Sequence, residues 1–170
     1  EDAGAIASDN TYEKDLNLEI SNVLCSLFEL NGTPVKMTRT EDTLLYDYYN
    51  DLDNYKGKKK IYDLKNRLRI AEELDNSIYV GIHMNKFPAE YCKGLQTFYN
   101  NENESGKLLA ELIQKNVRKL QTDNRRVIAD GKESIYLLKK LEIPATLIEC
   151  GFLSNFEEAA LLNNDNYKLS

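Results

Sequence analysis

One histidine and two glutamates occupy positions from which they could bind a metal ion and activate water. His83, the only histidine in the chain, follows the apolar run 77–82, and Glu149 follows the apolar run 145–148. Glu13 opens a segment with helical periodicity, where the helix dipole favours a carboxylate. In open α/β sheets, ligands bind just beyond the carboxyl ends of the strands. If a strand precedes the helix that begins at Glu13, all three side chains lie at the same edge of the sheet. A site with a metal ion and a general base requires such an arrangement.

Each of these residues also has an ordinary structural interpretation. A lone histidine after a strand is usually structural or simply exposed. A glutamate in the first turn of a helix, such as Glu13, most often serves only the helix dipole. Glu149 is the least ordinary of the three, because a carboxylate inside the apolar sequence ATLIECGFL is rarely buried without a partner. Residue types and spacing alone therefore leave the metal site an open hypothesis.

The elements that position these residues alternate between helix and strand. Apolar residues recurring at spacings of three and four predict helices, and short runs of β-forming residues predict strands. Helices are expected over residues 13–30, 62–74, 105–121, 134–141 and from 156 onward, and strands over 34–39, 77–82, 94–99 and 145–148. This alternation predicts a single α/β domain with a mostly parallel central sheet, flanked by helices on both faces.

The composition excludes several classes of protein. A chain of 170 residues is enough for one domain, and its apolar fraction of 42 % is ordinary for a globular fold. The net charge of −6 argues against a nucleic-acid-binding domain, which is normally basic. No apolar run approaches the ~18 residues of a membrane span. The chain also lacks a glycine-rich phosphate loop, which excludes a nucleotide-binding α/β domain.

Residues 41–60 are rich in tyrosine and charge and show no clean period. At about 20 residues this segment exceeds the usual length of a connection, so a lid or a contact surface is expected there. Its four tyrosines are the candidate contacts: Tyr46, Tyr48, Tyr49 and Tyr55. A solvent-exposed loop without a functional role is an equally consistent interpretation of this segment.

Five segments resemble successive signature blocks of the zinc-dependent N-acetylmuramoyl-L-alanine amidases, in the family's order and spacing. The segments are YEKDLNLEI (12–20), VKMTR (35–39), GIHMN (81–85), GLQTFY (94–99) and IPATLIECGFLSN (143–155). The last block is the most specific of the five. Within the family, the runs KNRLRIAEELDNSIYVGIHMN and EEAALLNNDNY are most similar to the sporulation amidases of the CwlD type, which prepare spore-cortex peptidoglycan.

The resemblance implies a role for each candidate residue. Glu13 and His83 correspond to zinc ligands of the family, and Glu149 corresponds to the catalytic glutamate. Arg67, in an Arg-x-x-x-Ala pattern, and Asn85, two residues after the histidine, are given supporting roles at most. For Arg67 a solvated helix arginine is an equally good interpretation.

The resemblance also implies that part of the family's domain lies outside this sequence. The family's first strand and histidine loop are expected just upstream of Glu1, and this loop carries the third zinc ligand. The end of the last helix is expected beyond Ser170. Because only two of the three protein ligands are present, we expect this chain to bind its single zinc ion weakly.

The function implied by the resemblance is hydrolysis of the amide bond between N-acetylmuramic acid and L-alanine in peptidoglycan. The narrower match implies a part in spore-cortex maturation, through muramic-lactam formation, and in germination. The alternative is a non-catalytic cell-wall binding or regulatory module on the same fold.

The expected binding partner is peptidoglycan and not nucleic acid. The resemblance is also compatible with an activating protein and with a membrane anchor upstream of this sequence. Because the substrate lies outside the cytoplasmic membrane, an extracytoplasmic location is expected, in the cell wall or in the forespore intermembrane space. Export would then depend on a segment that is not in this sequence.

Overall fold

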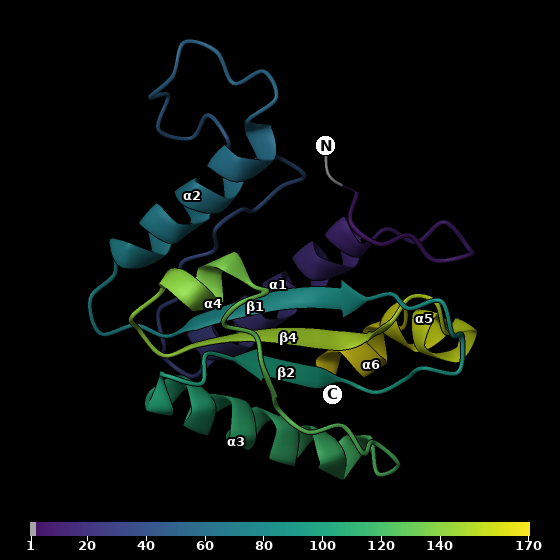
Figure 1. Ribbon diagram of the computed structural model, residues 1–170. Helices are drawn as coiled ribbons and strands as arrows, with labels where there is room; N and C mark the ends of the chain where they lie inside the picture. Colours follow the sequence, from purple (N-terminus) through teal and green to yellow (C-terminus); the bar gives the residue numbers. More distant parts are fainter. Residues whose placement is uncertain (1–2) are drawn as a thin grey trace.

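A four-stranded mixed sheet forms the centre of the computed structural model, which describes residues 3–170 (Figure 1). Its strands are β1 (Tyr79–Asn85), β2 (Gln96–Tyr99), β3 (Ala129–Asp130) and β4 (Ala145–Phe152). Their order across the sheet is β1-β4-β2-β3. β1 is parallel to β4 and β2 is parallel to β3, whereas β2 and β4 are antiparallel. The predicted α/β domain with a mostly parallel sheet is confirmed.

The helices described in residues 3–170 cover both faces of this sheet. They are α1 (Glu13–Leu30), α2 (Lys59–Glu72), α3 (Glu104–Leu120), α4 (Tyr136–Lys140), α5 (Phe156–Leu162) and α6 (Asp165–Leu169). α2 and α4 pack on one face through Ala71 and Leu138. α1 and α5 pack on the other through Leu16 and Leu162, while α3 runs along β2 and β4. None of these helices is both long and apolar enough to span a bilayer.

Side-chain alternation along β1 and β4 decides which residues share a face. Tyr79 and Leu147 belong to the apolar cluster beneath α2 and α4, whereas Met84 and Cys150 belong to the cluster beneath α1 and α5. Successive side chains of a strand point to opposite faces. Glu149, two residues after Leu147, therefore points to the face that carries α2 and α4.

The predicted strand 34–39 is not a strand. This segment is irregular, and it pairs with none of the strands described here. Val35 and Met37, the alternating apolar residues of this segment, do not lie on one face of a sheet. Their side chains line a groove beside α1. Alternation alone cannot distinguish a strand from an extended segment that lies over a groove.

Two strands are longer than the sequence predicts. β1 continues to Asn85 and β4 to Phe152, so His83 and Glu149 lie within strands and not after them. His83 and Glu149 are polar and end the apolar runs, whereas backbone pairing continues past them into residues that are again buried, such as Met84 and Phe152. β3 and α6 are not predicted from the sequence, because two and five residues give too few positions for a periodic pattern.

The outer edge of β1 has no partner strand in the part of the chain that the structure describes. Within residues 3–170, β1 pairs only with β4. A groove of about 1390 Å³ runs beside this edge, between α1, the irregular segment 33–44 and α2. Its lining is largely apolar at one end, where Leu24 and Phe28 lie, and contains Glu13 and His83 at the other. The predicted site therefore lies at the mouth of a groove.

Candidate active site

Glu13 is the first residue of α1, and its carboxylate turns back toward the loop that precedes the helix. Its Oε2 accepts a hydrogen bond of 2.7 Å from the backbone N–H of Ala5. The backbone approaches so closely that a Cβ at Gly4 would lie 2.4 Å from Oε2, and Gly4 has a φ of +66°. The conformation and the space both require glycine at this position. The loop therefore fixes one oxygen of the carboxylate.

The second oxygen of the Glu13 carboxylate meets His83. Glu13 Oε1 and His83 Nδ1 are 3.0 Å apart, although the two residues are 70 positions apart in the chain. The Glu13 side chain is 13 % exposed and that of His83 is 44 % exposed. The carboxylate is thus enclosed while the imidazole stays accessible from solvent.

Opposing effects act on the pKa of Glu13. Burial raises it, but hydrogen bonds from His83 and from the Ala5 N–H, together with the charge of His83, lower it further. The net result is a pKa below the ordinary value of 4.5. Glu13 is therefore ionised at neutral pH, which is the form that binds metal ions.

Glu149 lies beside His83 in the sheet. The two residues are register partners in the parallel β1–β4 ladder, so their side chains share a face. Glu149 Oε2 is buried and has no hydrogen-bond partner among the described residues. Burial raises the pKa of Glu149 to about 7, an effect that His83 opposes and Glu13 reinforces. A carboxyl group with this pKa can exchange a proton near neutral pH, as a general acid or base must.

Cys150, next to Glu149 in the sequence, does not belong to this group. Its side chain packs on the opposite face, against the apolar cluster beneath α1 and α5. Burial and the charge of Glu149 raise the pKa of the Cys150 thiol to about 12. The thiolate that a metal ion needs is therefore not available at neutral pH.

Arg67 and Asn85, given supporting roles by the resemblance, are held in different ways. Arg67 Nε donates to Asp63 Oδ2 at 2.8 Å and its Nη1 donates to Thr38 Oγ1 at 3.0 Å, which ties α2 to the segment 33–44. The backbone carbonyl of Asn85 accepts a hydrogen bond from Leu153 at a register irregularity. Neither side chain makes a described hydrogen bond to the three site residues above.

The described residues contain two converging metal donors and no complete set. Between residues 3 and 170, no group of three or more His, Cys, Asp or Glu side chains is placed to hold a metal ion. Glu13 and His83 are the pair that converges. The third ligand predicted upstream of Glu1 lies outside the described residues.

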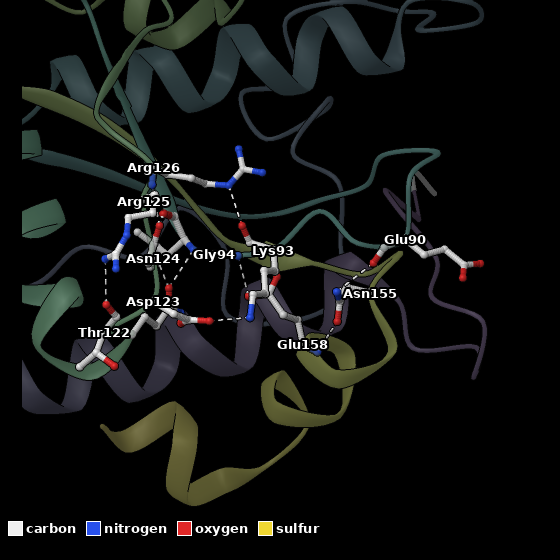
Figure 2. Close-up of polar contacts among 12 residues, drawn as sticks. Glu90, Lys93, Gly94, Thr122, Asp123, Asn124, Arg125, Arg126, Asn155 and Glu158 are labelled. Atoms are coloured by element: carbon white, nitrogen blue, oxygen red, sulfur yellow. Dashed lines mark hydrogen bonds and ion pairs between the residues drawn. The ribbon is translucent and has the colours of Figure 1, made fainter.

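Gln96 adjoins this site through its pairing with Glu149, Arg126 contacts Gln96, and Glu158 bonds the backbone near the ends of β2 and β4; none of the three is predicted from the sequence. Glu158 accepts hydrogen bonds from the backbone N–H groups of Gly94 and Phe152, at 2.7 and 2.8 Å (Figure 2). It thereby joins the start of β2 to the end of β4. Gln96 is the register partner of Glu149 on β2, and Arg126 donates to it. The one signal in the sequence is a polar glutamine in the otherwise apolar strand GLQTFY.

Comparison with known proteins gives concordant results. A family model described as N-acetylmuramoyl-L-alanine amidase matches residues 1–170. The germination-specific N-acetylmuramoyl-L-alanine amidase of Bacillus subtilis (strain 168) is 32% identical over 170 residues, which cover 98% of this chain and 68% of that protein. The CwlD amidase from Clostridioides difficile, in complex with the GerS lipoprotein, matches with a TM-score of 0.88 and 38% identity, over 98% and 84% of the two chains. The catalytic domain of CwlV from Bacillus (Paenibacillus) polymyxa var. colistinus matches with a TM-score of 0.78 and 26% identity, over 98% and 83%.

Proposed function

The chain belongs to the N-acetylmuramoyl-L-alanine amidase family, and from that premise we propose that its hydrolysis of peptidoglycan depends on zinc held by Glu13 and His83, with Glu149 as general base. The bond cleaved by this family joins N-acetylmuramic acid to L-alanine. One observation carries the proposal: Glu13 Oε1 lies 3.0 Å from His83 Nδ1, and Glu149 is the register partner of His83. Side chains from α1, β1 and β4 thus meet at one place.

The residues present fit a zinc ion as two of its ligands. Carboxylate oxygen and imidazole nitrogen bind zinc at ~2.0–2.2 Å, so two ligand atoms of a tetrahedral ion are roughly 3.3–3.5 Å apart. The separation of 3.0 Å between Glu13 Oε1 and His83 Nδ1 is close to that value. Glu149 Oε2, buried without a described partner, also indicates that a polar group belongs beside it.

The chemistry of the site divides between the metal and Glu149. Bound zinc polarises a carbonyl and lowers the pKa of water from 15.7 toward ~7. Glu149 accepts the proton of the attacking water and returns it to the departing L-alanine nitrogen. In the protein without metal, burial raises the pKa of Glu149 to about 7, so this carboxyl group can take up and release a proton near neutral pH. General acid–base catalysis of this kind contributes ~10²–10⁴-fold.

We infer that the substrate is spore-cortex peptidoglycan. The B. subtilis relative is described as germination-specific, and the C. difficile relative forms a complex with a lipoprotein. These descriptions support a protein that prepares the cortex for germination, acts outside the cytoplasmic membrane and binds an activating protein. The substrate itself lies there, since peptidoglycan is built outside that membrane.

The tyrosine-rich segment 41–60, whose last two residues begin α2, is our candidate contact for such a partner. Tyrosine rings pack within this segment: Tyr46 and Tyr55 meet edge to face at 5.3 Å, and Tyr49 donates a hydrogen bond of 2.5 Å to Glu73, just after α2. Tyr48 is 52 % exposed. An ordered loop that presents an exposed aromatic ring is a low-entropy binding surface.

The test of the reaction is digestion of purified peptidoglycan by the full-length protein with added zinc, followed by mass analysis of the products. Release of peptides that begin with L-alanine is expected. Glu149→Ala should abolish release while zinc stays bound, whereas His83→Ala should lose both. Glu111→Ala, at an exposed position of α3, is the matched control.

Two results would contradict the proposal. Full activity of Glu149→Ala would mean that another group takes the proton from water. Binding of peptidoglycan by the wild-type protein without any release of peptide would favour a non-catalytic cell-wall module instead.

A further inference from the structure

We propose that Gln96 and Arg126 form a binding site for a carboxylate of the stem peptide, next to Glu149. This inference rests on the proposed function, because it assigns the part of the substrate that lies beyond the scissile amide. Stem peptides carry carboxylates, and arginine binds a carboxylate through two parallel N–H···O bonds. Gln96 lies in the same row of the sheet as Glu149, and it holds the guanidinium of Arg126, which keeps unused N–H donors.

Gln96 continues the row of site residues across the sheet. It is the register partner of Glu149 in the antiparallel β2–β4 ladder, and Glu149 is the register partner of His83 in the parallel β1–β4 ladder. Register partners in adjacent strands place their side chains on the same face, with Cβ atoms ~4.5–5.5 Å apart in antiparallel pairs. His83, Glu149 and Gln96 therefore form one line across β1, β4 and β2.

Both ends of the Gln96 amide are held by the segment that follows α3. Its Nε2 donates to the carbonyl of Val127 at 3.0 Å, and its Oε1 accepts from Arg126 Nη1 at 3.0 Å. These bonds fix which end of the amide faces Arg126. Gln96 thus connects the guanidinium of Arg126 to the row that contains Glu149.

Two further contacts hold the guanidinium of Arg126 in place. Its Nε donates to the carbonyl of Lys93 at 2.8 Å, and its central carbon lies 4.4 Å from the ring centroid of Phe152, three residues after Glu149 on β4. Figure 2 shows the side chain extending over Lys93, with its terminal nitrogens pointing away from Asp123 and Arg125. A ligand that binds this group would find it already oriented, which lowers the entropic cost of binding.

Arg126 retains donors for a ligand. Of the five N–H donors of a guanidinium, the hydrogen bonds to Lys93 and Gln96 use two. Within residues 3–170, no carboxylate forms a salt bridge with Arg126. Glu158 is close enough for the charge of Arg126 to affect its pKa, but its two oxygens already accept from the backbone. A preoriented cation without an anionic partner, in line with the general base, fits an anionic part of the substrate.

The experiment compares two synthetic muropeptides that are identical except at the residue after L-alanine, which carries a carboxylate in one and a carboxamide in the other. The full-length, zinc-loaded protein should cleave the carboxylate form with the higher kcat/KM. In Arg126→Met, which keeps an apolar stem over Phe152, kcat/KM for the carboxylate form should fall roughly 10–100-fold, mainly through KM. For the carboxamide form the change should stay within about threefold.

Two further variants separate binding from folding. Gln96→Glu keeps a hydrogen-bond acceptor for Arg126, but its carboxylate neutralises the charge of the guanidinium. The same selective loss of kcat/KM on the carboxylate form is therefore expected while the guanidinium stays in place. Arg125→Met removes an equal charge from a neighbouring arginine, whose side chain donates to the Thr122 carbonyl, and should leave kcat/KM for both substrates unchanged.

The outcomes distinguish this inference from the proposed function. Equal losses on both substrates in Arg126→Met and Gln96→Glu would mean that the pair serves only the structure, and would overturn the inference while the amidase mechanism stands. No loss on either substrate would overturn it in the same way. Failure of the wild-type protein to cleave either muropeptide would overturn the proposed function and, with it, the carboxylate site.

Discussion

Glu149→Gln tests whether burial in the folded protein raises the pKa of the Glu149 carboxyl group. In the folded protein, burial raises the pKa of Glu149 from 4.5 to about 7, with His83 opposing and Glu13 adding to the effect. Between these two pH values the folded protein retains a proton that the unfolded chain releases. The free energy of unfolding therefore falls as pH rises from about 4.5 to about 7, and the full loss remains above pH 7. At 1.36 kcal/mol per pH unit, this interval corresponds to about 3 kcal/mol.

Urea unfolding of the wild-type protein and of Glu149→Gln, with a metal chelator present, measures this effect. Glutamine has nearly the same shape but cannot ionise. We expect the variant to gain most of that 3 kcal/mol over the wild type between pH 5 and pH 8. A constant difference at all pH values would reflect only the hydrogen bonds of the new amide, so the change with pH is the quantity to compare.

Glu111→Gln is the control for the loss of one negative charge, because Glu111 is exposed on α3. Its stability should differ from that of the wild type by less than about 0.5 kcal/mol at either pH. The reasoning is refuted if the difference between Glu149→Gln and the wild type does not change with pH. Glu149 would then ionise as an ordinary glutamate, and its assignment as general base would lose its physical support.

Three further predictions concern the surroundings of the site. Zinc should raise the melting temperature of the full-length wild-type protein but not of full-length His83→Ala, because a ligand that binds only the folded state stabilises it. Thermal melts with and without zinc decide this. Gly4→Ala should weaken zinc binding roughly 10–100-fold in calorimetric titration, since the new methyl group would displace the Glu13 carboxylate. Unchanged affinity would show that this loop does not position Glu13. Arg67→Met should lower the free energy of unfolding by about 2 kcal/mol in urea, because it leaves the largely buried Asp63 carboxylate without its guanidinium partner. An unaltered urea midpoint would mean that Asp63 needs no such partner.

The convergence of Glu13, His83 and Glu149 follows from features that the sequence contains. The apolar runs before His83 and before Glu149 mark two parallel strands, and parallel strands end at the same edge of a sheet. The periodicity of α1 gives its first residue as Glu13, as the structure has it. What the periodicity cannot give is the 3.0 Å contact between Glu13 and His83, which depends on Gly4, a left-handed glycine in the loop before α1.

Gln96 and Arg126 could not be assigned from the sequence for a different reason. Their relation to Glu149 depends on the antiparallel pairing of β2 with β4, and no spacing along the chain encodes which strands become neighbours. Arg126 also lies in an irregular segment, where no period indicates the direction of a side chain. The failure of the predicted strand 34–39 has the same origin, since a strand is defined by its partner.

The open edge of β1 has a consequence for handling the protein. Unpaired N–H and C=O groups along an edge strand can template pairing with a strand from another molecule. Here the unpaired edge of β1 adjoins the largely apolar groove beside α1. A preparation limited to these residues should therefore self-associate as it is concentrated. Turbidity and light scattering should then grow with protein concentration, and a lysine placed outward on β1 should delay their onset.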